Sequence, residues 1–175
     1  PKLKKGLEAL IKIANSLQGK RPNISIQIVD PGDHLDESLK LLELTRDDLP
    51  ENIKIVGGYP DAESLLADAT CLLLLSLWHE SGSRLIHECH LRGIPVLGFA
   101  TGGTTELLSQ FDADLFPRPL TRIDHKGVIK ITSWNSQAII ERIIKLLSDF
   151  EYYKQHHQTI LNKSSHLYDN NSKAA

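Results

Sequence analysis

Apolar residues follow two alternating patterns along this chain, and each pattern predicts a different kind of element. Recurrence every three or four positions indicates amphipathic helices, and short apolar runs bounded by turn residues indicate buried strands. The segment 71–110 combines both patterns in the order strand, helix, strand, helix. Outside it, the patterns predict helices over residues 3–17, 35–42, 61–69, 139–147 and 151–161, and strands over residues 24–29, 53–56 and 128–131.

Strands that alternate with helices in this way form a parallel sheet, because each helix returns the chain to the edge where the previous strand began. The pattern therefore predicts an α/β fold, a Rossmann-like parallel sheet with helices on both faces. The chain has 175 residues and no internal repeat, low-complexity tract or linker. We expect a single domain over residues 1–175.

Composition and charge are those of a soluble globular protein, with 41% hydrophobic and 24% charged residues. The net charge of −2 gives no general attraction to nucleic acid or to an anionic membrane. No apolar run approaches the length of about 18 residues that a membrane span needs, and we expect no signal peptide. We expect Cys71 and Cys89 to be buried, reduced thiols. Because the chain lacks Met, even at its first position, we expect it to be part of a longer protein.

The most informative motif joins two acidic residues, Glu80 and Glu88, across a loop and the start of a helix. Glu80 follows the first strand of the segment 71–110, at the carboxyl end, where open parallel sheets bind ligands. Glu88 falls about one and a half turns into the next helix. Two carboxylates at different depths suit a ligand with two sets of hydroxyl groups. Between them, the amides of Gly82, Ser83 and Arg84 open the helix and would face an anion.

This segment resembles the donor-binding domain of retaining glycosyltransferases of the GT-B fold, in particular family four. In that family two glutamates separated by seven residues precede Gly-Ile-Pro-Val and then Gly-Gly-x-x-Glu. The matching residues here are Glu80, Glu88, 93–96 and 102–106. Lys5 matches the lysine that opens the first helix of the domain, and residues 168–175 resemble the segment that leads back to the other lobe. The resemblance implies a carboxyl-terminal donor lobe whose partner is an acceptor-binding amino-terminal lobe.

The resemblance also implies a role for each part of the site in binding a nucleoside-diphosphate sugar. Glu80 would accept hydrogen bonds from the hexose near its anomeric carbon, and Lys5 would neutralise the pyrophosphate, so these are the expected catalytic residues. Glu88 would accept hydrogen bonds from both ribose hydroxyl groups. The other expected donor contacts are Gly57, Gly58 and Tyr59 beside the base, Gly82, Ser83 and Arg84 near the phosphates, and Gly102, Gly103 and Thr104 beside the sugar and phosphates.

The implied reaction is retaining transfer of a hexosyl group to a hydroxyl acceptor, as in polysaccharide biosynthesis. The nucleotide sugar is the substrate and no cofactor is expected, since cationic side chains and helix amides can stabilise the leaving diphosphate. We expect no nucleic-acid partner, no membrane segment in this chain and a cytoplasmic location, with any contact to the cytoplasmic membrane face made by the absent lobe. His87 and His90 flank Glu88, but their spacing is not that of a zinc protease, so no metal site is expected.

Two departures from the family pattern keep other functions open. Gly82-Ser83 stands where the family has an aromatic residue and a glycine, and residues 29–33 replace a Gly-x-Gly turn after the first strand. One alternative is a sugar-nucleotide epimerase or a glycan phosphorylase on the same scaffold. The other is a degenerate, non-catalytic nucleotide-binding or scaffolding module. The sequence does not identify the base, the sugar, the acceptor or the linkage.

Overall fold

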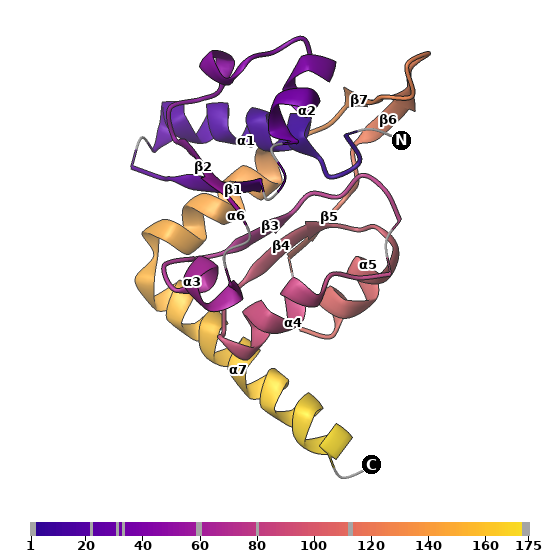
Figure 1. Cartoon of the computed structure of the whole chain (residues 1–175). Helices are drawn as coiled ribbons and strands as arrows, with labels where there is room; N and C mark the ends of the chain where they lie inside the picture. The colour runs from indigo at the N-terminus through magenta and orange to yellow at the C-terminus, as the bar shows by residue number, and fades with distance from the viewer. Residues whose placement is uncertain are drawn as a thin grey trace.

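The structure is a computed structural model that describes residues 3–21, 23–30, 32, 34–58, 61–79, 81–111 and 114–172, with the backbone alone for residues 167–172. Helices and strands alternate through most of the chain, as the sequence predicts (Figure 1). The elements, in chain order, are α1 (Leu7–Lys20), β1 (Ile26–Asp30), α2 (Leu35–Leu41), the 3-10 helix η1 (Arg46–Asp48), β2 (Ile53–Gly57), α3 (Ala62–Leu66), β3 (Leu72–Leu74), α4 (Arg84–Leu91), β4 (Val96–Phe99), α5 (Gly102–Ser109), β5 (Asp114–Phe116), β6 (Leu120–Ile123), β7 (Ile129–Ser133), α6 (Gln137–Ser148) and α7 (Phe150–Ser172).

The five strands of the first two-thirds of the chain pair in parallel, in two separate ladders. β1 pairs with β2 from Ile26 opposite Ile53 to Asp30 opposite Gly57. β3, β4 and β5 form a second ladder in that order. The predicted α/β class is confirmed, but the strands do not form one continuous sheet, because β1 and β3 are not hydrogen-bonded to each other among the described residues.

Helices cover both faces of the ladder β3–β4–β5, and the alternation of side chains along β4 explains why. Leu97 and Phe99 point to one face and pack with residues of α1 and α6. Val96 points to the other face and packs with residues of α3, α4 and α5. Consecutive residues of a strand point to opposite faces, so a strand buried on both sides needs apolar residues at nearly every position. All four residues of β4 are buried.

Two expectations about the last third of the chain need correction. The predicted strand at 128–131 is β7, but it belongs to an antiparallel hairpin with β6, which the pattern did not reveal. The last helix does not end near residue 161, because α7 continues to Ser172. The predicted Asp61 cap is confirmed, since its Oδ1 accepts the Ser64 amide at 2.8 Å, although α3 ends at Leu66 rather than near residue 69.

A side-chain hydrogen bond and ion pairs hold α7 against the rest of the molecule. His157 Nδ1 donates to the Gly93 carbonyl at 2.9 Å, just past the end of α4. On the α6 side, Asp114 lies 2.5 Å from Arg142 and 3.5 Å from His156. Although burial raises the pKa of Asp114, hydrogen bonds from His156 and Arg142 outweigh it and hold that pKa below its ordinary value. α7 is therefore fixed at α4, the helix that carries Glu88.

Candidate functional site

Three loop segments meet at the carboxyl ends of β3 and β4, and we call them the loop junction: residues 4–6, residues 76–79 with 81–83, and residues 101–104. The Leu77 amide donates to the Lys4 carbonyl at 2.7 Å. Gly6 lies so close to β3 that a Cβ there would be 2.0 Å from the Leu75 carbonyl oxygen, and its φ of +82° also favours glycine. The predicted site residue Lys5 lies between these two contacts, so the tertiary structure brings it to the loop that carries the acidic motif.

The second contact of the loop junction is between the motif loop (residues 76–79 with 81–83) and the start of α5. A Cβ on Gly103 would lie 2.1 Å from the Ser81 carbonyl oxygen, so glycine is needed there for space. The Gly102 amide donates to His79 Nδ1 at 3.1 Å. The predicted residues Gly102 and Gly103 therefore face the motif loop directly. Sequence reasoning missed His79 as an acceptor, and its only sequence signal is its position beside Glu80.

α4 begins inside the loop junction. Ser83 is its N-cap residue, in an extended conformation, and the Ser83 side chain makes no capping hydrogen bond. Arg84 Nε lies 3.2 Å from Glu88 Oε1, one turn along the helix, so Arg84 contacts the second motif glutamate rather than standing alone. The Arg84 side chain is 91% exposed and the Glu88 side chain 24% exposed. This pair contributes little to stability because Arg84 is solvated, and it leaves a cation and a carboxylate side by side at a helix N-terminus.

Not all of the predicted site residues present a side chain at this junction. Thr104 is 2% exposed and its methyl group packs over Gly98, so its side chain lies in the core. Gly57 and Gly58 end β2, in the other parallel ladder, with open space where a side chain would be. Their predicted role beside a base is neither supported nor contradicted by a described contact. Tyr59 and Glu80 lie outside the described residues.

The turn after β1, where the sequence departs from the family pattern, has a specific structure. Asp30 is 6% exposed, and its two carboxylate oxygens accept the amides of His34 at 2.9 Å and Leu35 at 3.0 Å. These amides open α2. A protein carboxylate therefore occupies the anion-binding end of α2, where a glycine-rich turn would leave the amides free for a phosphate. Among the described helices that follow parallel strands, α4 begins without a side-chain cap, whereas the first amide of α5, that of Gly102, already donates to His79.

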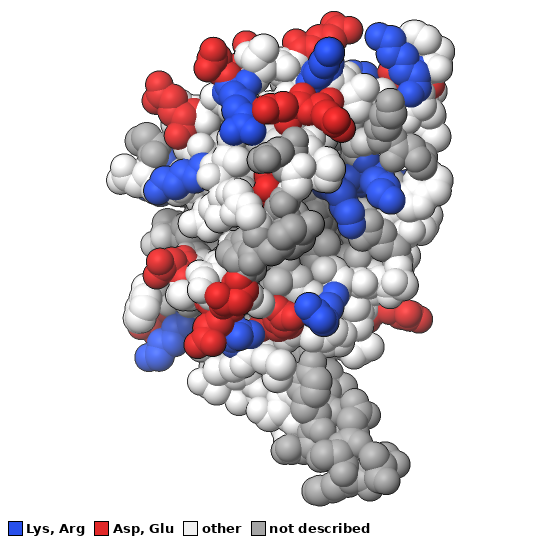
Figure 2. Space-filling model, in the orientation of Figure 1, with Lys and Arg blue, Asp and Glu red and all other residues white. Residues whose placement is uncertain are grey.

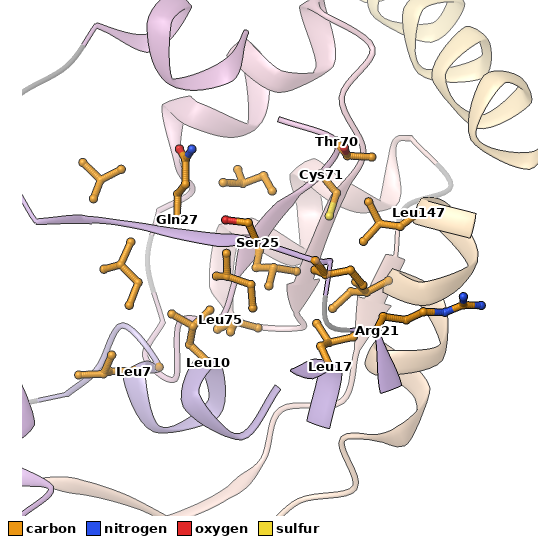
Figure 3. Close-up of a pocket in the computed structure, with 18 of the residues that line it drawn as sticks. Leu7, Leu10, Leu17, Arg21, Ser25, Gln27, Thr70, Cys71, Leu75 and Leu147 are labelled. Atoms are coloured by element: carbon orange, nitrogen blue, oxygen red, sulfur yellow. The ribbon is translucent and has the colours of Figure 1, made fainter. Parts of the chain in front are cut away.

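A cavity of about 1310 Å³ lies between β1 and β3, away from most of the predicted site (Figure 3). Many of its lining residues are aliphatic, and among the described residues Lys5 is the one predicted site residue on it. Cys71 also lines this cavity, and burial raises the pKa of its thiol to about 12. The pKa of Cys89 is likewise about 12, chiefly through burial. Both thiols are free in the structure, and Cys89 is buried as expected, whereas Cys71 is only half-buried. A raised pKa disfavours the thiolate, so neither thiol has the reactivity of a nucleophile.

On the face of the molecule drawn in Figure 2, charge is mixed rather than gathered into one field. Figure 2 shows lysine and arginine side chains in small groups separated by acidic ones. The part of the chain that the structure describes contains no group of three or more His, Cys, Asp or Glu side chains able to hold a metal ion. It also contains no helix that is both long enough and apolar enough to span a bilayer.

Comparison with solved structures gives the same fold. HepE of Anabaena in complex with UDP superposes with a TM-score of 0.70 at 22% identity, covering 95% of this chain and 42% of HepE. TarM superposes with a TM-score of 0.69 at 16% identity, covering 93% of this chain and 29% of TarM. WaaG, described as a glycosyltransferase involved in lipopolysaccharide biosynthesis, has a TM-score of 0.66 at 17% identity, covering 93% and 40%. The chain thus has the α/β fold of one lobe of these proteins and spans less than half of their length.

No match to a curated protein is found. A model of the family described as glycosyl transferases group 1 matches residues 2–163. This match includes the loop junction, the Arg84–Glu88 pair and both parallel ladders. Since it covers nearly the whole chain, the protein belongs to the glycosyl transferases group 1 family.

Proposed function

We propose that this chain is the donor domain of a retaining glycosyltransferase, which binds a nucleoside-diphosphate sugar and transfers its hexosyl group to a hydroxyl acceptor. The observation that carries the proposal is the loop junction, where Lys5, the start of α4 and the glycines at the start of α5 meet at the carboxyl ends of adjacent parallel strands. Ligands of open α/β sheets bind at this edge. HepE, which has the same fold, is described in complex with UDP-glucose.

The diphosphate is the part of the donor for which the junction is best suited. Arg84 and the amides of α4, which carry no side-chain cap, supply positive potential at the start of that helix. Lys5 belongs to a segment that is hydrogen-bonded to the same loop through Lys4 and Leu77, and in this proposal it adds a second cation. That potential would stabilise the charge that develops on the diphosphate as the bond to the sugar breaks. Asp30 makes the end of α2 unsuitable for the same task and His79 accepts the first amide of α5, so the phosphates belong at the start of α4.

The hydroxyl groups of the donor need acceptors, and the two motif glutamates supply them. Glu88 is one-quarter exposed and held by Arg84, so one carboxylate oxygen contacts the guanidinium and the other remains for the ribose hydroxyls. In this proposal Glu80 orients the hexose. The acceptor, bound by the other lobe, supplies the attacking hydroxyl. In this proposal the complete protein is a cytoplasmic enzyme of polysaccharide biosynthesis.

Donor binding by the purified chain tests the proposal. Backbone amide NMR shifts would be followed while UDP, GDP and ADP are added separately, first to the wild type and then to Glu88→Gln. We expect a saturable response to one nucleotide, with its affinity about 5- to 150-fold weaker in the variant, for the loss of about 1–3 kcal/mol of charged hydrogen bonding. Glu151→Gln, on exposed α7, is the matched control and should bind as the wild type does.

Equal affinity of wild type and Glu88→Gln would refute the assigned role of Glu88. No response to any nucleotide, by the chain or by the protein with its other lobe, would favour the non-catalytic module. An epimerase would bind the same donors but release free sugar isomers in place of a transferred product, so product analysis with the complete enzyme separates that alternative.

A further inference from the structure

The β6–β7 hairpin lies apart from both parallel ladders and exposes aliphatic side chains. β6 pairs only with β7 among the described strands. Leu120 is 68% exposed and Ile123 is 57% exposed, at the two ends of this four-residue strand. Single exposed leucines are common on protein surfaces. Because they are three residues apart, Leu120 and Ile123 point to opposite faces of β6, on either side of the strand edge that does not pair with β7. Two large exposed aliphatic residues that flank one strand edge indicate a surface that meets another molecule.

The hairpin is also a basic segment in a chain that is acidic overall. Residues 118–133 contain four basic residues and one acidic residue, a net charge of +3 against −2 for the whole chain. Arg118, Arg122 and Lys126 are exposed. Figure 2 shows a group of basic side chains at the upper right, where Figure 1 places β6 and β7. The positive potential of the hairpin is therefore local and borne by solvated side chains.

The one acidic residue of the hairpin is turned toward its own backbone. Asp124 Oδ1 accepts the amide of Lys126 at 2.8 Å and that of Val128 at 2.9 Å, which closes the turn between the strands. Its charge thus shapes the tip of the hairpin instead of pairing with an arginine side chain of β6. The exposed cations are left to face an external anion.

β7 anchors the hairpin rigidly. Its Ile131 amide donates to Glu8 Oε2 at 2.9 Å, and Lys130 Nζ donates to the Leu41 carbonyl at 2.9 Å. Just beyond β7, Trp134 packs edge-on against Phe99 of the core, with ring centroids 5.3 Å apart. The hairpin is therefore a fixed platform rather than a loose loop.

A cleft extends the apolar surface at the base of the hairpin. It has a volume of about 310 Å³ and is lined by Pro119, Leu120 and Trp134, with Arg118 beside them. Leu120 belongs both to the exposed strand and to this cleft. The apolar surface and the cations are consequently adjacent, which is the arrangement of an amphipathic interface.

We propose that the β6–β7 hairpin binds the surface of an anionic lipid bilayer. With the outer edge of β6 toward the bilayer, Leu120 and Ile123 would enter the boundary between headgroups and acyl chains from the two faces of the strand, and Arg118, Arg122 and Lys126 would contact the phosphate groups. Charge complementarity selects an anionic partner, and the aliphatic side chains favour a lipid interface over a nucleic acid, which is bound through aromatic stacking and polar contacts. The inference is independent of the proposed donor site, since no residue is shared.

The position of the hairpin gives this attachment a consequence for the loop junction. β5 ends at Phe116 and β6 begins at Leu120, so the hairpin leaves from the carboxyl end of β5. The loop junction lies at the carboxyl ends of the neighbouring strands β3 and β4, in the same parallel ladder. A bilayer bound by the hairpin would therefore lie beside the edge of the sheet that carries the proposed donor site.

Co-sedimentation with lipid vesicles tests the proposal. The chain would be mixed with vesicles of phosphatidylcholine alone and with vesicles containing about one-third phosphatidylglycerol, at low and at high salt. We expect binding to the anionic vesicles alone, weakened by salt. The triple variant Arg118→Gln/Arg122→Gln/Lys126→Gln should bind about a hundred-fold more weakly, at about five-fold for each cation near an anionic surface.

The aliphatic contribution is tested by Leu120→Ser/Ile123→Ser, which should also reduce binding at least ten-fold. The matched controls make the same change in charge or hydrophobicity at exposed positions outside the hairpin. They should bind vesicles as the wild type does. They are Lys40→Gln/Lys54→Gln/Lys154→Gln for charge and Leu91→Ser/Phe150→Ser for hydrophobicity.

Circular dichroism of each variant verifies that it is folded, and the charge variant tests the proposal even if the aliphatic variant does not fold. Absence of wild-type binding to anionic vesicles would overturn the proposal. So would hairpin variants that bind no more weakly than their controls. Concentration-dependent dimerisation that is lost in Leu120→Ser/Ile123→Ser, without vesicle binding, would instead assign the surface to a second copy of this chain.

Discussion

Replacement of Gly103 by alanine should destabilise this protein, although alanine normally stabilises a helix. Gly103 is the second residue of α5. In an unobstructed helix, Gly→Ala is worth about 0.5–1 kcal/mol in favour of alanine. Here the new methyl carbon would lie 2.1 Å from the Ser81 carbonyl oxygen and 2.9 Å from the Gly82 amide nitrogen. Both neighbours are backbone atoms, so the loop or the helix must move by more than 1 Å to restore contact distances of about 3.4 Å.

The magnitude follows from two opposed effects. Insertion of a methyl group into a closely packed site costs about 1–3 kcal/mol, and a backbone obstacle belongs at the upper end of that range. After the gain in helix propensity is deducted, the free energy of unfolding should fall by about 1–2 kcal/mol. The same displacement moves the motif loop, so nucleotide affinity should fall as well if the loop junction is the donor site.

Urea unfolding followed by tryptophan fluorescence measures the stability effect, since the chain has two tryptophans. Gly19→Ala is the matched control, because Gly19 lies in α1 and has no atom within 4 Å of the added Cβ. That variant should be unchanged or up to about 1 kcal/mol more stable. If Gly103→Ala were as stable as Gly19→Ala, the close contact between α5 and the motif loop would be refuted.

Two further predictions concern buried polar groups, and the same unfolding assay measures both. Asp30→Ala removes the acceptor for both amides that open α2 and should lower the free energy of unfolding by about 1–2 kcal/mol, whereas wild-type stability would show that the cap is dispensable. For His90, burial and the charges of His87 and His156 lower the pKa to about 4, while the unfolded chain protonates near 6.5. Below pH 6.5 the unfolded state binds the extra proton, so stability should fall with pH toward 4, by about 2 kcal/mol at pH 5. In His90→Leu the free energy of unfolding should no longer fall with pH in this way, whereas in the exposed control His125→Leu it should. An equal pH dependence of stability in both variants would assign the effect to another group.

The order of helices and strands could be predicted from the sequence because burial leaves a local mark on it. β4 is apolar at nearly every position since both of its faces are covered, and α6 presents apolar residues at helical spacing since one face is covered. The Asp61 cap is local too, because donor and acceptor lie three residues apart. The spacing from Glu80 through Gly102 and Gly103 likewise stands in the sequence, and it was sufficient to identify the family.

The elements that the sequence did not predict, β5, β6 and the second half of α7, have no clear periodic pattern of buried residues. β5 has three residues and β6 four, and β6 is largely exposed, so their existence depends on a paired strand rather than on a burial pattern. The second half of α7 has few apolar residues, and its docking depends on single contacts such as that of Ser164 Oγ with the His90 carbonyl at 3.0 Å. A contact across 74 residues leaves no periodicity in either segment.

By itself, the sequence determined the α/β class, the place of the motif after a strand and the identity of most candidate site residues. Only the tertiary structure decided which of them meet. The packing of distant segments brought Lys5 and Gly103 to the motif loop and placed Thr104 in the core. It also made Asp30 the acceptor for the amides at the start of α2 and separated the two parallel ladders. The reason is physical: periodicity records whether a position is buried, whereas hydrogen bonds and close backbone contacts between distant segments depend on how the segments are packed together.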